Sequence, residues 1–143
     1  MNDEANGLKA IAQRFFCAYD AHDVDAMVAL CADGALGRYL PLGRNSVMPI
    51  RGGIDNIWRA FPQAVPLFRV EVVEMILAEG STVIVQAIMS GPIPADPLGI
   101  AKDGEDVHIG HCYILRYDPK GKIARLDCYW DNAVLNGIVK SKL

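Results

Sequence analysis

The stretch VHIGHCYILRYDPKGKIARLDCYWD, residues 107–131, carries the pattern that decides the fold. Side chains of different character alternate with a period of two on both sides of Asp118-Pro119-Lys120-Gly121, as expected for two strands joined by a turn. We therefore predict strands over 107–117 and 123–130, paired as a hairpin. A second hairpin is predicted just upstream, with strands over 67–78 and 82–90 around Glu79-Gly80-Ser81.

The segment between the two predicted hairpins, residues 91–106, contains three prolines and three glycines. Irregular loops of this length are often functional, so the segment could form a lid over one end of the sheet. A plain surface connection explains the composition equally well.

The first half of the chain shows helical periodicity instead. A stripe of apolar side chains predicts a helix over 4–22, and a second short helix should begin at Asp23 and end near Asp33-Gly34. A short strand over 35–39 and an edge strand over 48–51 are expected next. Apolar spacing at Ile54, Ile57, Trp58 and Phe61 predicts a third helix, and the chain should finish in a short helical segment over 132–139.

Length and composition limit the classes of protein that are possible. The 143 residues predict one domain over 1–143, and 52% hydrophobic residues are enough to build a core. A net charge of −3 without a basic cluster argues against a nucleic-acid partner. The sequence shows no membrane span and no signal peptide, so we expect a cytoplasmic location without membrane attachment.

The four cysteines, Cys17, Cys31, Cys112 and Cys128, show none of the close spacings of a metal site. We expect no metal, and free thiols that behave as small apolar side chains. A disulfide is the alternative, although it would be unusual in the cytoplasm.

Two segments resemble a known superfamily. Residues 10–36, AIAQRFFCAYDAHDVDAMVALCADGAL, resemble the opening of ketosteroid isomerases and SnoaL-type polyketide cyclases. Residues 121–131, GKIARLDCYWD, resemble the closing strand of those families and of limonene epoxide hydrolase. The chain is thus similar to the nuclear-transport-factor-two-like superfamily. This resemblance implies an α+β fold: a cone-shaped, curved antiparallel sheet, a cystatin-like α+β barrel, with the N-terminal helices packed on its concave face.

Strand alternation then divides the side chains between the two faces. Matching to the families places one set inside the cone: His111, Tyr113, Leu126, Cys128 and Trp130. Phe15, Tyr19 and Phe61 should close the cone from the helices, with Trp58 as the alternative to Phe61 in its wall. Asp127 and Tyr129 should point to the other face, although a one-residue slip in register would turn Asp127 inward. Whether Asp131 reaches the cavity stays open.

The family positions for catalysis hold different residues in this chain. The isomerases use a carboxylate base after the second helix, a tyrosine on the first helix and a protonated acid on a central strand. The matching positions in this chain hold Tyr39, Phe15 and Tyr113, in that order. The cyclase His and Asp positions match Tyr113 and Cys128. Limonene epoxide hydrolase uses an Asp, an Arg and a second Asp around a water. The positions that match them in this chain hold Ile88, Gln86 and Cys128. The carboxylates that these families use are therefore missing at the matched positions.

The remaining inward groups suggest a hypothesis for function. His111 is the candidate general acid or base, because imidazole exchanges protons near neutral pH. Tyr113 and Tyr39 are the candidate hydroxyl donors. The expected ligand wall comprises Phe15, Tyr19, Trp58, Phe61, Leu126, Cys128 and Trp130. The predicted function is a cofactor-independent isomerase, cyclase or dehydratase acting on an apolar cyclic or aromatic ketone of polyketide, steroid or terpenoid type.

Two other readings stay open. The missing carboxylates also fit a non-catalytic protein that binds or carries a small apolar ligand. The outward residues of the last two strands mix apolar and oppositely charged groups, which favours a homodimer through the convex face of the sheet.

Overall fold

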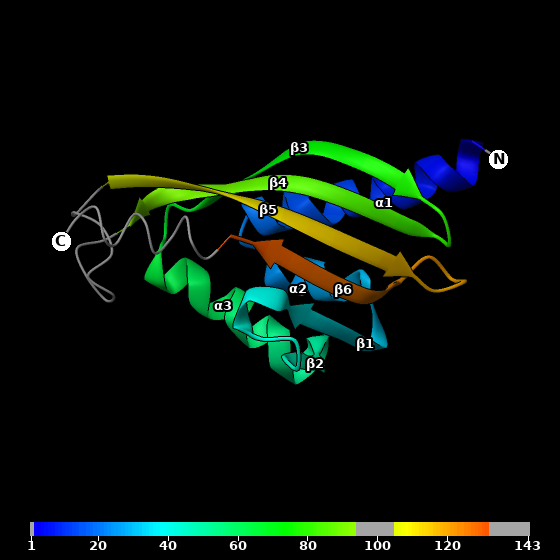
Figure 1. The fold of residues 1–143 in the computed structure, drawn as a ribbon, viewed down its shortest axis with the longest axis horizontal. Coiled ribbons are helices and arrows are strands. Elements are labelled where there is room, and N and C mark those ends of the chain that lie inside the picture. The colour runs from blue at the N-terminus through cyan, green and yellow to red at the C-terminus, as the bar shows by residue number, and fades with distance from the viewer. Residues whose placement is uncertain (1, 94–104, 132–143) are drawn as a thin grey trace.

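The computed structural model describes residues 2–93 and 105–131. The predicted helical segment over 132–139 and most of the predicted loop, 94–104, lie outside these residues. Three α-helices, two short helical segments, η1 (Leu40–Leu42) and η2 (Ile50–Ile54), and six strands follow one another along the described chain (Figure 1). The helices are α1 (Asn2–Asp20), α2 (Val24–Ala29) and α3 (Asp55–Ala64). The strands are β1 (Cys31–Tyr39), β2 (Val47–Pro49), β3 (Arg69–Ala78), β4 (Thr82–Ile93), β5 (Glu105–Tyr117) and β6 (Ile123–Trp130).

The strands form one open sheet in the order β2-β1-β6-β5-β4-β3. The two predicted hairpins, β3–β4 and β5–β6, are present and antiparallel. We predicted an antiparallel sheet. The observed sheet is mixed, because β1 runs parallel to β6. β2, α3 and β3–β5 lie between β1 and β6 along the chain, so no tight turn joins these two strands and they can run parallel.

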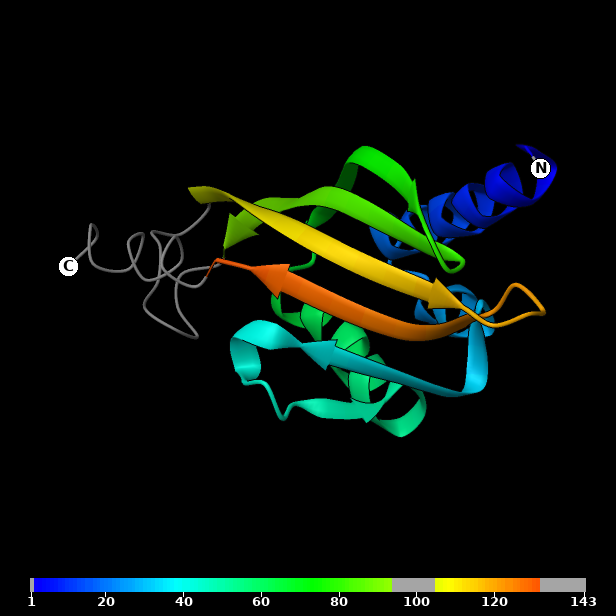
Figure 2. The same ribbon diagram turned by 45° about the vertical axis from the view of Figure 1, so that its right-hand side comes forward.

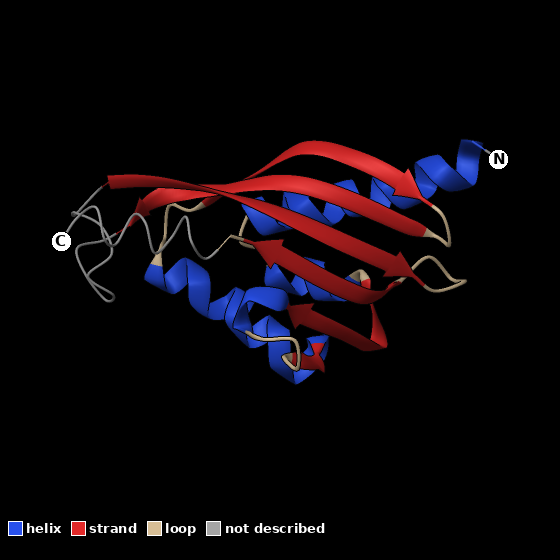
Figure 3. Ribbon diagram, viewed as in Figure 1, coloured by secondary structure: helices blue, strands red, loops and turns tan. Residues whose placement is uncertain are grey.

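The helices cover one face of the sheet and leave the other uncovered (Figure 3). We call the helix-covered face the inner face and the opposite one the outer face. The strands twist and bend around the helices, as the rotated view shows (Figure 2). This arrangement confirms the predicted α+β class with helices packed on a concave sheet face.

Local sequence explains the helix boundaries. The Asp23 carboxylate accepts a hydrogen bond from the Ala26 backbone N–H at 3.1 Å and so caps α2 as predicted. The helix ends at Ala29, however, and not near Asp33-Gly34. Residues 31–34 extend β1 instead, because Cys31 pairs with Ile123 of β6.

The β3–β4 turn has the geometry of a tight hairpin. Gly80 and Ser81 have φ angles of 69° and 54°, the positive values that a type I′ turn needs at both central positions. This turn sets the register in which Val85 of β4 pairs with Met75 of β3. On its other side, Val85 pairs with Tyr113 of β5.

Aromatic rings fill the space between the inner face and the helices. Phe15 meets Trp58 edge to face with ring centroids 5.5 Å apart, and Phe16 meets Tyr113 in the same way at 5.0 Å. Edge-to-face contacts of this kind add about 0.5–1.5 kcal/mol each beyond area burial. Among the described residues, no helix is both long and apolar enough to cross a membrane.

Candidate functional site

Polar groups from five elements converge at the centre of the aromatic interior. Tyr19 comes from α1, Tyr39 from β1, Trp58 from α3, Tyr113 from β5 and Cys128 from β6. Cys128 lies between the two strand tyrosines, because it pairs with Tyr39 on one side and with Tyr113 on the other. All five side chains are buried. We call this set the interior cluster.

Hydrogen bonding within the interior cluster begins at Trp58. Its indole N–H donates to the Tyr39 hydroxyl at 2.6 Å. Burial raises the pKa of Tyr39 well above its ordinary value, and burial likewise raises the pKa of Tyr19. Both phenols are therefore neutral at physiological pH and can act as hydrogen-bond donors.

Tyr113 differs from the other phenols in its acceptors. Its hydroxyl donates toward the sulfur of Met89 at 3.9 Å and also interacts with the Cys128 sulfur and with the Tyr19 hydroxyl. Burial raises the pKa of Tyr113 well above its ordinary value and that of the Cys128 thiol to about 12. Thioether and thiol sulfur are weak acceptors, so a carbonyl oxygen would be a better partner for this hydroxyl.

His111 and Trp130 lie beside the interior cluster, toward one end of the sheet. They pair with each other across β5 and β6, with ring centroids 5.3 Å apart. The His111 ring stacks on Tyr113 at 6.0 Å, and Trp130 meets Tyr39 edge to face at 5.5 Å. The predicted convergence of His111, Tyr113 and Trp130 on one face is confirmed by this register.

The tautomer of His111 follows from its backbone contact. Nδ1 lies 3.0 Å from the Ile109 carbonyl oxygen, which can only accept a hydrogen bond. Nδ1 therefore carries the hydrogen in the neutral ring, and Nε2 carries the lone pair. Burial lowers the pKa of His111 below 6.5, more than the Ile109 carbonyl raises it. The ring is thus a neutral base at physiological pH.

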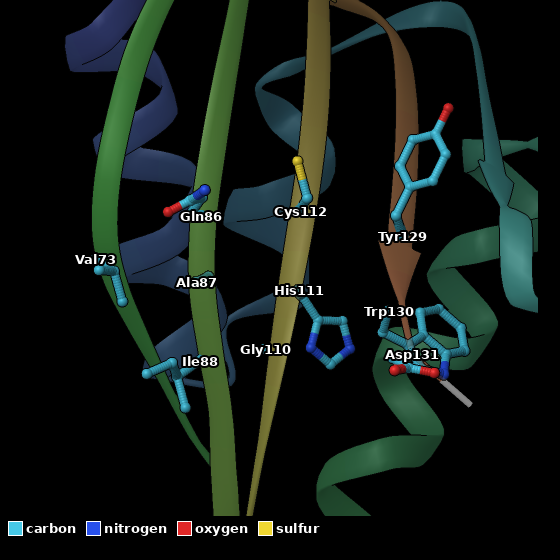
Figure 4. A pocket seen from close by; sticks show the side chains of 10 residues that line it. All are labelled: Val73, Gln86, Ala87, Ile88, Gly110, His111, Cys112, Tyr129, Trp130 and Asp131. Atoms are coloured by element: carbon cyan, nitrogen blue, oxygen red, sulfur yellow. The ribbon is translucent and has the colours of Figure 1, made fainter. Parts of the chain in front are cut away.

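A hollow of about 480 Å³ opens beside His111 (Figure 4). It lies mainly over the outer face. Gly110 pairs with Ile88 there, and because glycine has no side chain, the space between Ile88 and β6 stays open. The lining residues are Val73, Gln86, Ala87, Ile88, Gly110, His111, Cys112, Tyr129, Trp130 and Asp131. Our expectation placed the pocket inside the cone. There, bulky rings already occupy the space around the interior cluster.

The predicted ligand-wall residues separate into two groups. Six of them, Phe15, Tyr19, Trp58, Leu126, Cys128 and Trp130, lie within the core or pack against it. Phe61 does not close the cone as predicted: it is 40% exposed and packs edge to face on Phe68 at 4.8 Å. Phe61 lies on the same side of α3 as Trp58 but about one turn nearer the C-terminal end of the helix, where it meets Phe68 instead of the interior cluster.

Asp127 keeps the predicted outward direction without a slip in register. It pairs with Ile114 and Arg38 on the outer face, where Arg38, Arg116 and Arg125 bind its carboxylate. Among the residues described, Asp127 is the one buried carboxylate, and because it lies on the outer face, no buried carboxylate lies in the described core around His111. In the same part of the chain, no three His, Cys, Asp or Glu side chains are grouped to hold a metal ion.

Sequence reasoning missed Met89 and the arginine cluster around Asp127. Met89 is two residues beyond Ala87 on β4, so strand alternation places both side chains on the inner face. The sequence could therefore have identified Met89 as an inward residue. The contact with the Tyr113 hydroxyl depends on how far each side chain reaches along the strands. The grouping of Arg38 with Asp127 depends on the parallel β1–β6 pair, which we had not predicted.

Comparison with known proteins identifies the family. The profile described as SnoaL-like domain matches residues 12–126. The chain belongs to the SnoaL-like domain family. No curated protein sequence matches it.

Several solved structures share the fold at low sequence identity. IdmH, a candidate polyketide cyclase from Streptomyces antibioticus, superposes with a TM-score of 0.81 at 14% identity, covering 93% of this chain and 98% of IdmH. AclR, a candidate hydroxylase from Streptomyces galilaeus, gives 0.78 at 15% identity, with 95% and 85% covered. A protein with a ketosteroid isomerase-like fold from Catenulispora acidiphila, solved with trimethylamine, gives 0.72 at 16% identity, with 91% and 92% covered.

Proposed function

We propose that this SnoaL-like protein binds a small, largely apolar cyclic or aromatic ketone and catalyses an isomerase- or cyclase-type reaction without a cofactor. The observation that carries the proposal is the state of His111. Its Nδ1 hydrogen is engaged by the Ile109 carbonyl, so Nε2 presents a lone pair next to the Tyr113 and Trp130 rings. The related fold of a candidate polyketide cyclase supports a polyketide-like substrate over a steroid or a terpenoid.

The proposed chemistry begins with proton abstraction beside the ketone carbonyl. His111 Nε2 takes the proton from the carbon next to the carbonyl, and the electron pair moves onto the carbonyl oxygen. When the ketone carries a β,γ double bond, the resulting dienolate takes the proton back from the His111 imidazolium at its γ-carbon, which isomerises the substrate. Alternatively, the α-carbon of the enolate attacks a second carbonyl of the same molecule, which closes a ring, and the oxygen of that carbonyl takes the proton from the His111 imidazolium.

Tyr113 is the proposed donor to the enolate oxygen. Its hydroxyl is neutral and buried, and its contact with the Met89 sulfur is long at 3.9 Å, so a carbonyl in the place of Met89 would be a stronger acceptor. Tyr39, held by Trp58 at 2.6 Å, is proposed as a second donor. Because side chains fill the interior, the proposed ligand must displace some of them, and Met89 is the flexible side chain in contact with the Tyr113 hydroxyl. The proposed wall around it includes Phe15, Tyr19, Leu126, Cys128 and Trp130.

The test is exchange of ketone α-protons for deuterium, followed by NMR with 2-tetralone and an aromatic 1,3-diketone as probes. We expect catalysed exchange that falls at least about 100-fold in His111→Ala and His111→Gln. His108→Ala is the matched control, because His108 is exposed and three residues away on the same strand. Exchange that survives in both His111 variants would exclude His111 as the base.

A carrier without catalysis is the second candidate. The absence of a carboxylate from the described core favours it, since related isomerases depend on such a group. Binding of the same ketones can be followed by quenching of Trp130 fluorescence, with Trp130→Phe as the control. Saturable binding without any deuterium exchange would establish carriage.

We further propose that the protein is a homodimer that associates through the outer face of the sheet. Apolar side chains are exposed there, including Val73, Ile76 and Tyr129. Light scattering of the purified protein over a range of concentrations tests this proposal, and a monomer at every concentration would refute it.

A further inference from the structure

Met89 lies at the boundary between the core and solvent. Three residues precede it on the inner face of β4, Val83, Val85 and Ala87, and each is at most 2% exposed. Met89 itself is half-buried and packs against the same core. Its side chain can therefore turn toward solvent while the strand stays in place.

The Met89 side chain extends along the sheet toward Tyr113. Ala87 of β4 pairs with His111 of β5, and this pair lies between the backbone of Met89 and the backbone of Tyr113 (Figure 4). The Tyr113 hydroxyl nevertheless lies 3.9 Å from the Met89 sulfur. The two side chains therefore meet over the Ala87–His111 pair. Because Ala87 is small, it leaves the space beside His111 that the thioether and the phenol fill.

The proposed reaction needs this same space. A ketone within reach of both groups has its oxygen at the Tyr113 hydroxyl and the carbon next to its carbonyl at His111. Such a molecule must lie over Ala87, where the Met89 thioether lies in this structure. The size of the ligand is then limited by how far the Met89 side chain withdraws.

The backbone around Met89 leaves little freedom to enlarge this space. Met89 is paired on both sides, with Val70 of β3 and with Ile109 of β5. Further along β4, Gly91 packs so closely against Phe68 that a Cβ there would lie 2.9 Å from the Phe68 Cα atom. Room for a ligand must therefore come from the Met89 side chain, which is unbranched and adopts new rotamers easily.

We propose that Met89 is the specificity-determining residue of this site: it turns toward solvent to admit a ketone over Ala87, and its bulk selects small rings over larger fused-ring systems. The inference rests on the function proposed above and names the size class of its substrate. When Met89 withdraws, the Tyr113 hydroxyl keeps its contacts with the Tyr19 hydroxyl and the Cys128 sulfur, so the donor is not left without an acceptor.

The first test compares the dissociation constants of cyclohexanone, 2-tetralone and a three-ring dihydrophenanthrenone. Met89→Ala removes Cγ, Sδ and Cε, and should improve binding of the three-ring ketone relative to cyclohexanone at least about tenfold, because the space is then preformed. Met89→Leu fills the space again and should keep the wild-type preference. Met75→Ala is the matched control, since Met75 is also partly buried against the core but is separated from Tyr113 by β4.

Methyl NMR of the wild-type protein makes the test independent of how well the variants fold. The chain contains five methionines, so labelling their methyl groups with carbon-13 gives a simple spectrum, in which Met89→Leu assigns the Met89 signal. Saturation with 2-tetralone should shift the Met89 signal more than the Met75 signal, because the ligand displaces the Met89 side chain.

The outcomes separate this inference from the proposed function. If the wild type binds the ketones but Met89→Ala keeps the wild-type size preference, or Met75→Ala changes it equally, the proposed function survives and the role of Met89 is refuted. A Met89 signal that stays in place at saturation refutes that role as well. If no ketone binds to the wild type or to Met89→Ala, the proposed function fails and the role of Met89 fails with it.

Discussion

Asp127→Asn should destabilise the protein although the substitution preserves the shape of the side chain. The Asp127 side chain is 5% exposed, and its two oxygens accept hydrogen bonds from Arg38, Arg116 and Arg125. An asparagine offers one oxygen and one N–H₂ group, and the N–H₂ group would point its hydrogens at a guanidinium donor. At least one arginine therefore loses its acceptor.

The magnitude follows from the exposure of the arginines. A hydrogen bond to a charged group contributes about 1.5–3 kcal/mol when both partners are buried. The three arginine side chains are 26%, 49% and 30% exposed, so water replaces part of what they lose. We expect Asp127→Asn to lower the free energy of unfolding by about 2 kcal/mol.

Urea unfolding at pH 7 and fixed protein concentration measures this change. Asp25→Asn is the matched control, because Asp25 binds Arg59 at 2.9 Å with both side chains well exposed. It should cost less than about 0.5 kcal/mol, and added salt should remove that cost while leaving the Asp127 effect in place. Equal losses in the two variants would show that the arginine cluster does not anchor the outer face.

Two further predictions concern the inner face. Because burial lowers the pKa of His111 below 6.5, its contribution to stability is complete above about pH 6.5 and is lost as the pH falls toward the folded-state pKa. Urea titrations across this range should show the decline in the wild type and not in His111→Phe, and parallel curves would contradict it. Gly37→Ala should cost about 1–3 kcal/mol, since its new Cβ would lie 2.6 Å from Ile54 Cδ1 and 3.0 Å from Ile50 Cδ1. Gly34→Ala meets no atom within 4 Å and should be close to neutral, so equal melting temperatures of the two variants would refute the packing argument.

Much of the fold could be read from local pattern. The period-two alternation over 107–130 assigned His111, Tyr113, Cys128 and Trp130 to one face, and the observed pairs of His111 with Trp130 and Tyr113 with Cys128 agree. Alternation is reliable here because a one-residue slip would expose the whole apolar set.

The content of the core was harder to predict. Strand alternation gives the direction of a side chain but not the space that its neighbours leave. Phe15, Phe16 and Trp58 fill the region where we expected a cavity, and Phe61 lies outside it. The hollow beside His111 opens on the opposite side of the sheet, at Gly110.

By itself, the sequence determined the elements, their faces and the family, because periodicity and turn residues act over a few neighbouring positions. Only the tertiary structure decided that β1 lies parallel to β6, which brings Arg38 to Asp127 and Tyr39 to Cys128 across 89 residues of chain. It also decided that the Ile109 carbonyl holds the His111 ring in one tautomer. Such contacts depend on the path of the whole chain and on close packing, neither of which is encoded in a local pattern.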